Sequence, residues 1–215
     1  MLPRMQDELF EVVDESGKVL GLRRRRECHG NPALIHQAVH LLVFNRRGEL
    51  FLQQRAQTKD IQPGKWDSAV GGHVSAGEDL DTALTRELRE ELGVTKLSLD
   101  ASGARVDPIL RYRWDSDQES ELVFSFIVTY GGPFAPDGKE VSEGRFWSFD
   151  EIRANLGKGL LTPNFEHEFG LIEKAAAEAA LASKSAREPL AVVNTSTSSS
   201  AAGEQGAAKD GRGKR

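Results

Sequence analysis

The sequence predicts an α/β fold, and three observations support this prediction. Short runs rich in Val, Leu and Ile alternate along the chain with segments of helical periodicity, as expected for alternating strands and helices. The chain has 215 residues, 39% of them hydrophobic and 28% charged, and about 180 residues are enough to bury the core of a single domain. Beyond Lys184 the composition changes to Ser, Ala, Gly, Thr and charged residues. We therefore expect one folded domain followed by a disordered tail.

The expected strands are separated by turn-forming residues. Residues 14–17, Asp-Glu-Ser-Gly, lie between two runs rich in Val and Leu, which predicts a hairpin. Residues 39–44 place apolar side chains on both faces, which is typical of a central strand. In chain order, strands are expected in a hairpin over residues 8–25, at 39–44 and 50–54, near 107–114 and 120–130, and at 146–148.

Three helices are expected, each with a recognisable start. The first follows Gly77, whose backbone permits a tight turn into the helix, and it stops at Gly93. Ser148 can cap a short helix over about residues 149–156. Thr162 followed by Pro163 predicts the cap and first position of a last helix that runs to about Ser183.

Three carboxylates, those of Glu87, Glu90 and Glu91, lie on adjoining positions of the first helix. Side chains three or four positions apart are neighbours on a helix surface, so these acids repel one another unless a cation lies among them. Glu87 and Glu91 also fall in the apolar sector that faces the core. A buried carboxylate takes up a proton or binds a cation, and several oxygens directed at one point favour Mg²⁺ or Mn²⁺. This pattern indicates a metal site rather than a solvated helix face.

Arg86 and the glycines before the helix complete this arrangement. Arg86 is next to Glu87 and four positions before Glu90, so its guanidinium can hold one carboxylate in place while the others bind metal. Gly71 and Gly72 supply a bare backbone that lets a carbonyl approach an ion. We therefore predict a metal site beside Arg86, with the ligands Glu87, Glu90, Glu91 and Gly72.

Residues 72–94 resemble, position for position, the signature box of the Nudix hydrolases. The matching residues are Gly72, Glu78, Arg86, Glu87, Leu88, Glu90, Glu91, Gly93 and Val94. The resemblance implies a Nudix-type α/β/α sandwich with a mixed central sheet and a Mg²⁺ or Mn²⁺ cofactor held by the helix acids. It also implies that water attacks the phosphorus of a small-molecule diphosphate, helped by the cation's charge. The catalytic residues that it implies are Arg86, Glu87, Glu90 and Glu91.

A second resemblance covers about residues 10–170, which are similar to the isopentenyl-diphosphate isomerases of the Nudix fold. His29, His36, His73, Glu119 and Glu121 stand at the five metal-binding positions of those enzymes and imply a possible second metal site. Arg55 and Lys59 stand where the isomerases hold the substrate's diphosphate. Each set has a structural alternative: histidines satisfied in the core or at the surface, a polar outer face of a strand, and a solvated strand end.

The chain departs from the isomerases at the residues that carry their chemistry. Gly71 stands where they have a catalytic cysteine, and the single cysteine, Cys28, is elsewhere. Asn164 stands where they have a tryptophan that shields a cationic intermediate. Because the helix box is complete, we expect a hydrolase on an isomerase-like frame. The alternatives are an isopentenyl-diphosphate isomerase and a binding module without activity.

The sequence leaves open which group takes the proton from the attacking water. Glu140 and Glu143 lie in a segment that resembles the late loop and strand of Nudix enzymes, and either could act as a base. They could equally be ordinary surface acids. In that case one of the helix glutamates could act as the base instead.

The expected domain boundaries divide the chain into three parts. Residues 1–30 form an N-terminal hairpin extension, residues 31–183 the Nudix hydrolase domain, and residues 184–215 a disordered low-complexity tail. Within this tail, residues 195–202 offer almost nothing that packs. Such a segment cannot bury enough apolar surface to offset the entropy lost on ordering.

Charge and composition restrict the partners and the compartment. The formal net charge of -5 gives no electrostatic basis for binding duplex nucleic acid, and the four arginines at residues 23–26 are expected to be an exposed strand end. The first ten residues lack the apolar stretch of a secretory signal, and one cysteine forms no disulfide within the chain. We expect a cytoplasmic enzyme that acts on a small molecule without a membrane partner; its oligomeric state is left open.

Overall fold

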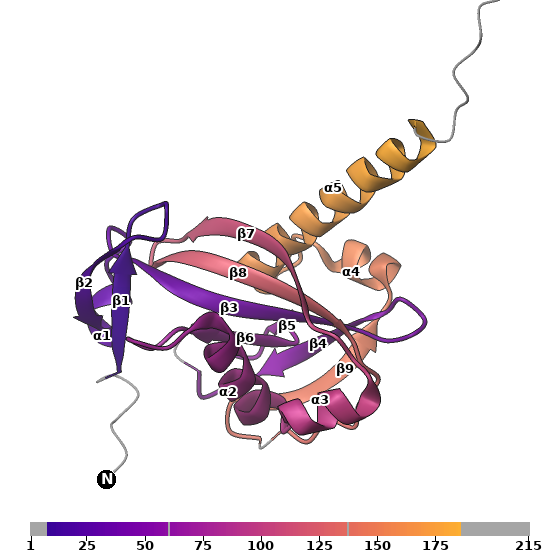
Figure 1. Cartoon of the computed structure of the whole chain (residues 1–215), viewed down its shortest axis with the longest axis horizontal. Helices are drawn as coiled ribbons and strands as arrows, with labels where there is room; N and C mark the ends of the chain where they lie inside the picture. The colour runs from indigo at the N-terminus through magenta and orange to yellow at the C-terminus, as the bar shows by residue number, and fades with distance from the viewer. Residues whose placement is uncertain (1–7, 60, 137, 186–215) are drawn as a thin grey trace, which may run out of the picture. The chain divides into compact units, whose positions relative to one another are not determined.

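The computed structural model describes residues 8–59, 61–136 and 138–185. The chain divides into two compact units, residues 1–173 and 174–215, and the fold described here is that of the first. Its elements (Figure 1) are β1 (Leu9–Val13), β2 (Val19–Arg24), α1 (Arg25–Cys28), β3 (Ile35–Phe44), β4 (Leu50–Arg55), β5 (Trp66–Ser68), β6 (Val70–His73), α2 (Leu80–Leu92), α3 (Lys96–Ser102), β7 (Asp107–Asp115), β8 (Ser120–Thr129), β9 (Val141–Trp147), α4 (Phe149–Asn155) and the start of α5 (Pro163–Ser185). Among the described helices, none combines the length and the apolar character needed to cross a bilayer.

A mixed sheet with β3 at its centre organises the fold. β3 pairs in parallel with β8 along its whole length, from Ile35 opposite Ser120 to Phe44 opposite Thr129. Along its other edge β3 pairs antiparallel with β1, β6 and β4 in turn. β4 also pairs antiparallel with β5 and β9, and β7 pairs antiparallel with β8. The prediction of a mixed central sheet is confirmed.

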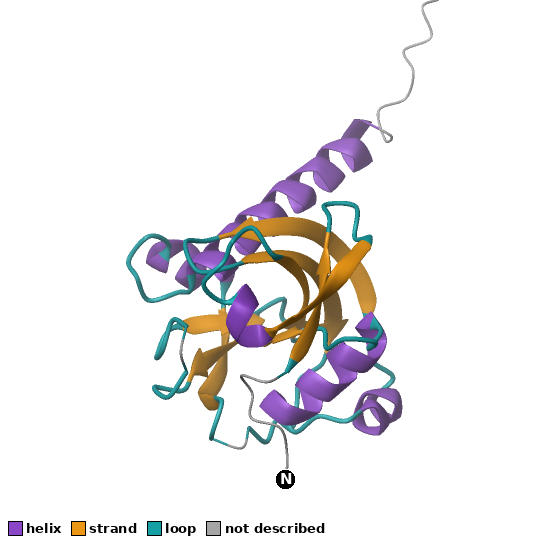
Figure 2. Ribbon diagram, turned by 90° about the vertical axis from the view of Figure 1, so that its left-hand side faces the viewer, coloured by secondary structure: helices purple, strands orange, loops and turns teal. Residues whose placement is uncertain are grey.

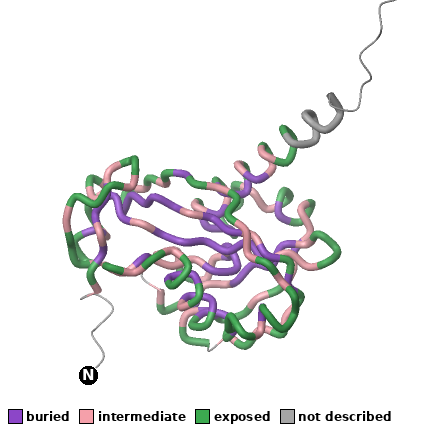
Figure 3. Tube along the Cα trace, in the orientation of Figure 1, coloured by how far each residue is buried: buried purple, intermediate pink, exposed green. Residues whose placement is uncertain are grey.

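Helices cover both faces of this sheet, and Figure 2 shows the curved strands between them. Successive side chains of a strand point to opposite faces, and β3 uses both. On one face Val39, Leu41 and Val43 share a hydrophobic cluster with Leu84, Leu88 and Leu92 of α2 and Leu99 of α3. On the other face Leu42 packs with Ile152 of α4 and with Phe165 and Phe169 of α5. Buried residues accordingly run along β3 and β8 (Figure 3), and the predicted α/β/α sandwich is confirmed.

The N-terminal hairpin is joined to the central strand. β1 pairs antiparallel with β2, and Val12 also pairs with His36 of β3. Phe10 is fully buried, and its ring stacks on those of His36 and His73, with centroids 5.0 and 4.8 Å apart. The boundaries expected at residues 30 and 183 stay predictions. Of the expected tail over residues 184–215, the part from residue 186 lies outside the described residues.

The sequence analysis did not predict four elements, α1, β5, β6 and α3, and two strands are longer than expected. β6 contains two glycines, which disfavour strands, and it forms because it pairs with β3. α3 begins after Thr95, whose side chain exchanges capping hydrogen bonds with Ser98, and it ends at Gly103. β3 begins at residue 35 and β9 at residue 141, earlier than the expected residues 39 and 146. The early parts of both strands mix polar and apolar side chains, so they lack the continuous apolar run that indicates a buried strand.

Candidate active site

Helix α2 carries two of its acids on the side that faces the core. Asp79 caps the first turn by accepting a 2.7 Å hydrogen bond from the backbone N–H of Thr82, and Gly93 ends the helix with a φ of 64°. Glu87 and Glu91 are 9% and 2% exposed, whereas the side chain of Glu90 is 45% exposed. The prediction that Glu87 and Glu91 fall within the apolar sector is confirmed.

Glu91 accepts hydrogen bonds from neutral donors, and the charge of the nearby Glu87 affects its pKa. Its Oε2 accepts hydrogen bonds from Gln53 Nε2 at 2.9 Å and from the N–H of Gly71 at 3.0 Å. Burial raises the pKa of Glu91, and the charge of Glu87 raises it further. Burial also raises the pKa of Glu87, against the opposing effect of Arg86. Two such carboxylates cannot both ionise at low cost unless a cation joins them.

Gly72 of β6 provides the space that Glu87 occupies. A Cβ added to Gly72 would overlap the carboxylate end of Glu87. A Cβ added to Gly71 would instead meet its nearest neighbours, two atoms of the His40 ring, at an ordinary 3.5 Å. Glycine at position 72 is therefore needed for the observed placement of the acid, and the donor set around it fits a hard divalent cation.

Arg86 links the start of α2 to its acids. The guanidinium donates to Glu87 Oε1 at 2.6 Å, to both oxygens of Glu78 at 3.0 and 2.8 Å, and to the carbonyl of His73 at 2.9 Å. Glu90 Oε2 lies 3.4 Å away. The hydrogen bonds that Arg86 donates to Glu78 raise the pKa of Arg86, so this cation keeps its charge and fixes the carboxylate of Glu87.

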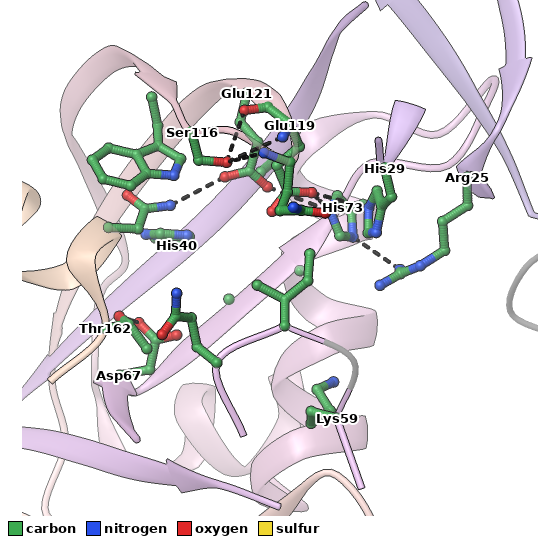
Figure 4. A pocket seen from close by; sticks show the side chains of 18 of the residues that line it. Arg25, His29, His40, Lys59, Asp67, His73, Ser116, Glu119, Glu121 and Thr162 are labelled. Carbon is green, nitrogen blue, oxygen red and sulfur yellow. Dashed lines mark hydrogen bonds and ion pairs between the residues drawn. The ribbon is translucent and has the colours of Figure 1, made fainter. Parts of the chain in front are cut away.

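A cavity of about 1040 Å³ opens beside these acids. Glu87, Glu90, Arg86 and Gly72 line it, and Glu91 lies outside the lining set. Figure 4 shows that His29, His73, Glu119 and Glu121 face another part of the same cavity. The acids of the helix and the His/Glu set are therefore brought to one concave surface, which is the usual form of a small-molecule site.

The predicted His/Glu set comes together from four parts of the chain. Side-chain ligand atoms of His29, His36, His73 and Glu119 all lie within 4.8 Å of one another. Glu119 Oε2 is 3.1 Å from Nε2 of His29 and 4.0 Å from Nε2 of His36 and of His73. Glu121 Oε1 is 3.3 Å from Nε2 of His73.

Two observations on this His/Glu set fit a metal ion of the Zn²⁺ or Mn²⁺ type. His36 Nε2 is buried without a hydrogen-bond partner among the described residues. Burial also lowers the pKa of His36 and, well below its usual value, that of His73. Low pKa values favour the neutral imidazole that binds metals.

The two cations expected to bind a diphosphate both line the cavity, and each is paired with an acid. Arg55 Nη1 lies 3.2 Å from Asp67 Oδ2. Lys59 Nζ lies 2.6 Å from Glu140 Oε2. Glu140 therefore also reaches the cavity, whereas Glu143 is exposed on β9 and lies outside the lining set.

The expectation that residues 23–26 form an exposed strand end is wrong for Arg26, which lies in α1, and above all for Arg25. This residue begins α1, its side chain is 12% exposed, and its Nη1 lies 3.1 Å from Nδ1 of His73. It lines the cavity together with His29. Arg25 and His73 are 48 positions apart, so neither spacing nor composition could indicate this contact.

Comparison with known proteins identifies the family of this chain. The family model of the NUDIX domain matches residues 34–165. The chain is 33% identical over 154 residues to an isopentenyl-diphosphate Delta-isomerase of Streptomyces avermitilis, an alignment that covers 70% of this chain and 76% of the isomerase. It is 35% identical over 139 residues to an uncharacterized Nudix hydrolase of Pseudomonas aeruginosa, covering 65% of this chain and 78% of that one.

A solved structure shows the same fold. The crystal structure of DR0079 from Deinococcus radiodurans matches with a TM-score of 0.64 at 21% identity, covering 78% of this chain and 98% of that one. At this identity the likeness concerns the fold, and the family follows from the sequence matches. The chain therefore belongs to the Nudix family of hydrolases, in the branch that includes the isopentenyl-diphosphate isomerases.

Proposed function

We propose that this hydrolase depends on a divalent cation and cleaves the diphosphate linkage of a nucleoside diphosphate or related organic diphosphate by attack of water at phosphorus. The observation that supports this most strongly is the buried pair Glu87 and Glu91 beside a large cavity. Two adjacent carboxylates with raised pKa values lower the stability of a core unless a cation compensates them. Together with Glu90 they offer the oxygen-rich surroundings that Mg²⁺ or Mn²⁺ prefers.

Each residue of the cavity wall has a role in this proposal. Glu87, Glu90, Glu91 and the carbonyl of Gly72 would hold the cation, which when bound would offset the charge repulsion between the diphosphate and the attacking water. Arg86 positions Glu87. Arg55 and Lys59 bind diphosphate oxygens from the cavity wall.

Glu140 is the better placed of the two acids outside the helix to take the proton from the attacking water. It lines the cavity, whereas Glu143 does not. Its carboxylate is held by Lys59, which fixes it near the proposed diphosphate site. A base must lie within hydrogen-bond reach of the water it activates, and this favours Glu140 over Glu143.

The cluster of His29, His36, His73, Glu119 and Glu121 supports a second cation site. Replacing His36 by glutamine should lower the affinity for Zn²⁺ or Mn²⁺ by about tenfold or more, because even residues that only orient metal ligands change affinity by about 10 to 100-fold. The affinity is measured by metal titration against a competing chelator. His167→Gln, an exposed residue of α5 outside the cavity lining, is the matched control. Equal affinities in both variants would contradict the site.

Isomerisation of isopentenyl diphosphate is the second candidate function, because the named isomerase is among the relatives. Gly71 has no thiol to carry a proton, and the amide of Asn164 is hydrogen-bonded to Tyr112 at 2.8 Å and to Glu121 at 3.1 Å. These two residues replace the cysteine and the tryptophan of the isomerases. We therefore place hydrolysis first.

A product assay separates the candidates. The purified protein is incubated with Mg²⁺ and a panel of nucleoside diphosphates, nucleotide sugars and prenyl diphosphates. Release of phosphate or of a monophosphate product supports the hydrolase. Movement of the alkene in isopentenyl diphosphate without phosphate release would replace it with the isomerase, and no turnover of any compound would leave a binding module.

We also propose that the enzyme works in the cytoplasm on small molecules, without duplex nucleic acid or a membrane as partner. The net charge of -5 supports this. Burial raises the pKa of the single cysteine, Cys28, to about 11, so the thiol stays protonated and unreactive, as suits a structural residue in a reducing compartment.

A further inference from the structure

A buried chain of hydrogen-bonded side chains ends at the cavity wall. His40 of β3 is 6% exposed and Glu168 of α5 is fully buried. Glu168 Oε2 lies 3.1 Å from His40 Nδ1, and its Oε1 accepts a hydrogen bond from Ser125. Burial alone would lower the pKa of His40, but the charge of Glu168 outweighs it and raises the pKa to about 9. A fully buried carboxylate 3.1 Å from Nδ1 favours the imidazolium form of His40, in which Nε2 also carries an N–H.

The second donor of His40 faces Gly71 and the cavity. Both Cδ2 and Nε2 of His40 lie 3.5 Å from the place where a Cβ of Gly71 would stand. Because Gly71 has no side chain, this edge of the ring borders the cavity that both residues line. Within the described part of the chain, no group accepts a hydrogen bond from Nε2. The backbone N–H of Gly71 donates to Glu91. The Nε2 edge of His40 therefore borders the same part of the cavity as the proposed metal site.

The wall beside His40 is polar. Asn164 bridges Tyr112 and Glu121, and Thr162 donates to Asp67 at 2.9 Å. Figure 4 shows Thr162 and Asp67 on the same side of the cavity as His40. An organic group that enters here therefore meets hydrogen-bonding side chains as well as the ring of Trp114.

Building on the proposed function, we propose that His40, held by Glu168, determines specificity: its Nε2–H donates to an oxygen of the organic group attached to the diphosphate. The enzyme then selects an oxygen-bearing group, such as a sugar or a nucleoside, over a hydrocarbon chain. A hydrocarbon would displace water from the donor without replacing its hydrogen bond. Sites built to hydrogen-bond a substrate discriminate strongly against analogues that lack the partner, because a buried polar group is left unpaired.

The test compares two substrates in three proteins: wild type, His40→Phe, which keeps an aromatic ring without a donor, and His40→Gln, which keeps a side-chain N–H. We measure kcat and KM with Mg²⁺ for ADP-ribose, whose organic groups carry oxygens, and for isopentenyl diphosphate, which is a hydrocarbon beyond its diphosphate. Wild type should prefer ADP-ribose. His40→Phe should raise the KM for ADP-ribose by about tenfold or more, which is the range expected for losing a hydrogen bond to a charged group. The KM for isopentenyl diphosphate should change little, and His40→Gln should recover part of the loss.

Controls separate this role from a structural one. His167→Phe makes the same change at an exposed position of α5 outside the cavity lining and should leave both KM values unchanged. Suppose that wild type hydrolyses substrate. The proposed role of His40 is then refuted if His40→Phe keeps the wild-type KM for ADP-ribose, or if KM rises equally for both substrates. Either result leaves the proposed hydrolase function intact. If wild type hydrolyses nothing, the proposed function falls and this inference with it. Should His40→Phe fail to fold, Glu168→Gln, which removes the charge holding His40, must raise the same KM; an unchanged value overturns the assignment.

Discussion

Replacing Glu91 by glutamine is expected to reduce kcat/KM for diphosphate hydrolysis by more than about 100-fold while the protein stays folded. Glutamine keeps an oxygen that can accept the hydrogen bonds from Gln53 and Gly71, so the local packing is retained. It cannot supply the negative charge that a divalent cation requires. Losing a residue that merely orients a metal ligand already lowers metal affinity or activity by about 10 to 100-fold. Losing a ligand should therefore lower the activity further. The measurement is steady-state kinetics at saturating Mg²⁺.

Thermal unfolding distinguishes a lost ligand from a lost fold in this variant. Burial and the charge of Glu87 raise the pKa of Glu91 above its ordinary value of 4.5. The free energy of unfolding therefore decreases as the pH rises above 4.5, because the unfolded state ionises this group more readily than the folded state. Without metal near neutral pH, the Tm of Glu91→Gln should therefore equal or exceed that of wild type. Glu15→Gln, at an acid whose side chain is 76% exposed, is the control and should change neither activity nor Tm. Wild-type turnover in Glu91→Gln would refute the metal assignment.

Replacing Gly72 by alanine is the second large effect that we expect. The new Cβ would overlap Cγ, Cδ and Oε1 of Glu87, which are the end of a flexible side chain, so the chain can fold with Glu87 displaced. The φ angle of Gly72 lies outside the positive range, so alanine fits the backbone there. The affinity for Mg²⁺ and the rate of hydrolysis should both fall by about tenfold or more, as measured by calorimetry and kinetics.

Gly71→Ala is the matched comparison for this variant. It makes the same chemical change one residue earlier, where the nearest side-chain atoms would lie at an ordinary 3.5 Å from the new Cβ. The backbone N–H that binds Glu91 is retained. Gly71→Ala should therefore keep the Mg²⁺ affinity of wild type. Unchanged affinity in Gly72→Ala, or an equal loss in both variants, would show that the placement of Glu87 does not govern metal binding.

The helix acids could be predicted from the sequence because their determinants are local. Glu87 and Glu91 are four positions apart on one helix, and the leucines around them fix which side faces the core. The same reasoning found the caps at Ser148 and Gly93. The fold class followed from alternating patterns and from the resemblance of residues 72–94, which are all short-range properties of the chain.

The rest of the cavity depends on contacts that no short-range pattern encodes. His40 and Glu168 are 128 positions apart and meet because β3 and α5 pack together. Arg25 reaches His73 because β6, which carries His73, pairs with β3. The His/Glu set was assembled from the resemblance alone, since its members come from separate elements. Burial of single polar residues such as His40 has no period to recognise.

Calorimetric titration of Mg²⁺ tests the cation site most directly, because repeating it in buffers of different ionisation enthalpy counts the protons released on binding. Burial raises the pKa of Glu87 and of Glu91 above 4.5. At about pH 6 the metal-free pair should therefore still hold protons, which the cation must displace when it binds. Proton release should decline as the pH rises through the raised pKa values, where the pair has already ionised. We predict release from wild type, and neither release nor tight binding in the double variant Glu87→Gln, Glu91→Gln. Binding with wild-type affinity and the same proton release in that variant would contradict the account.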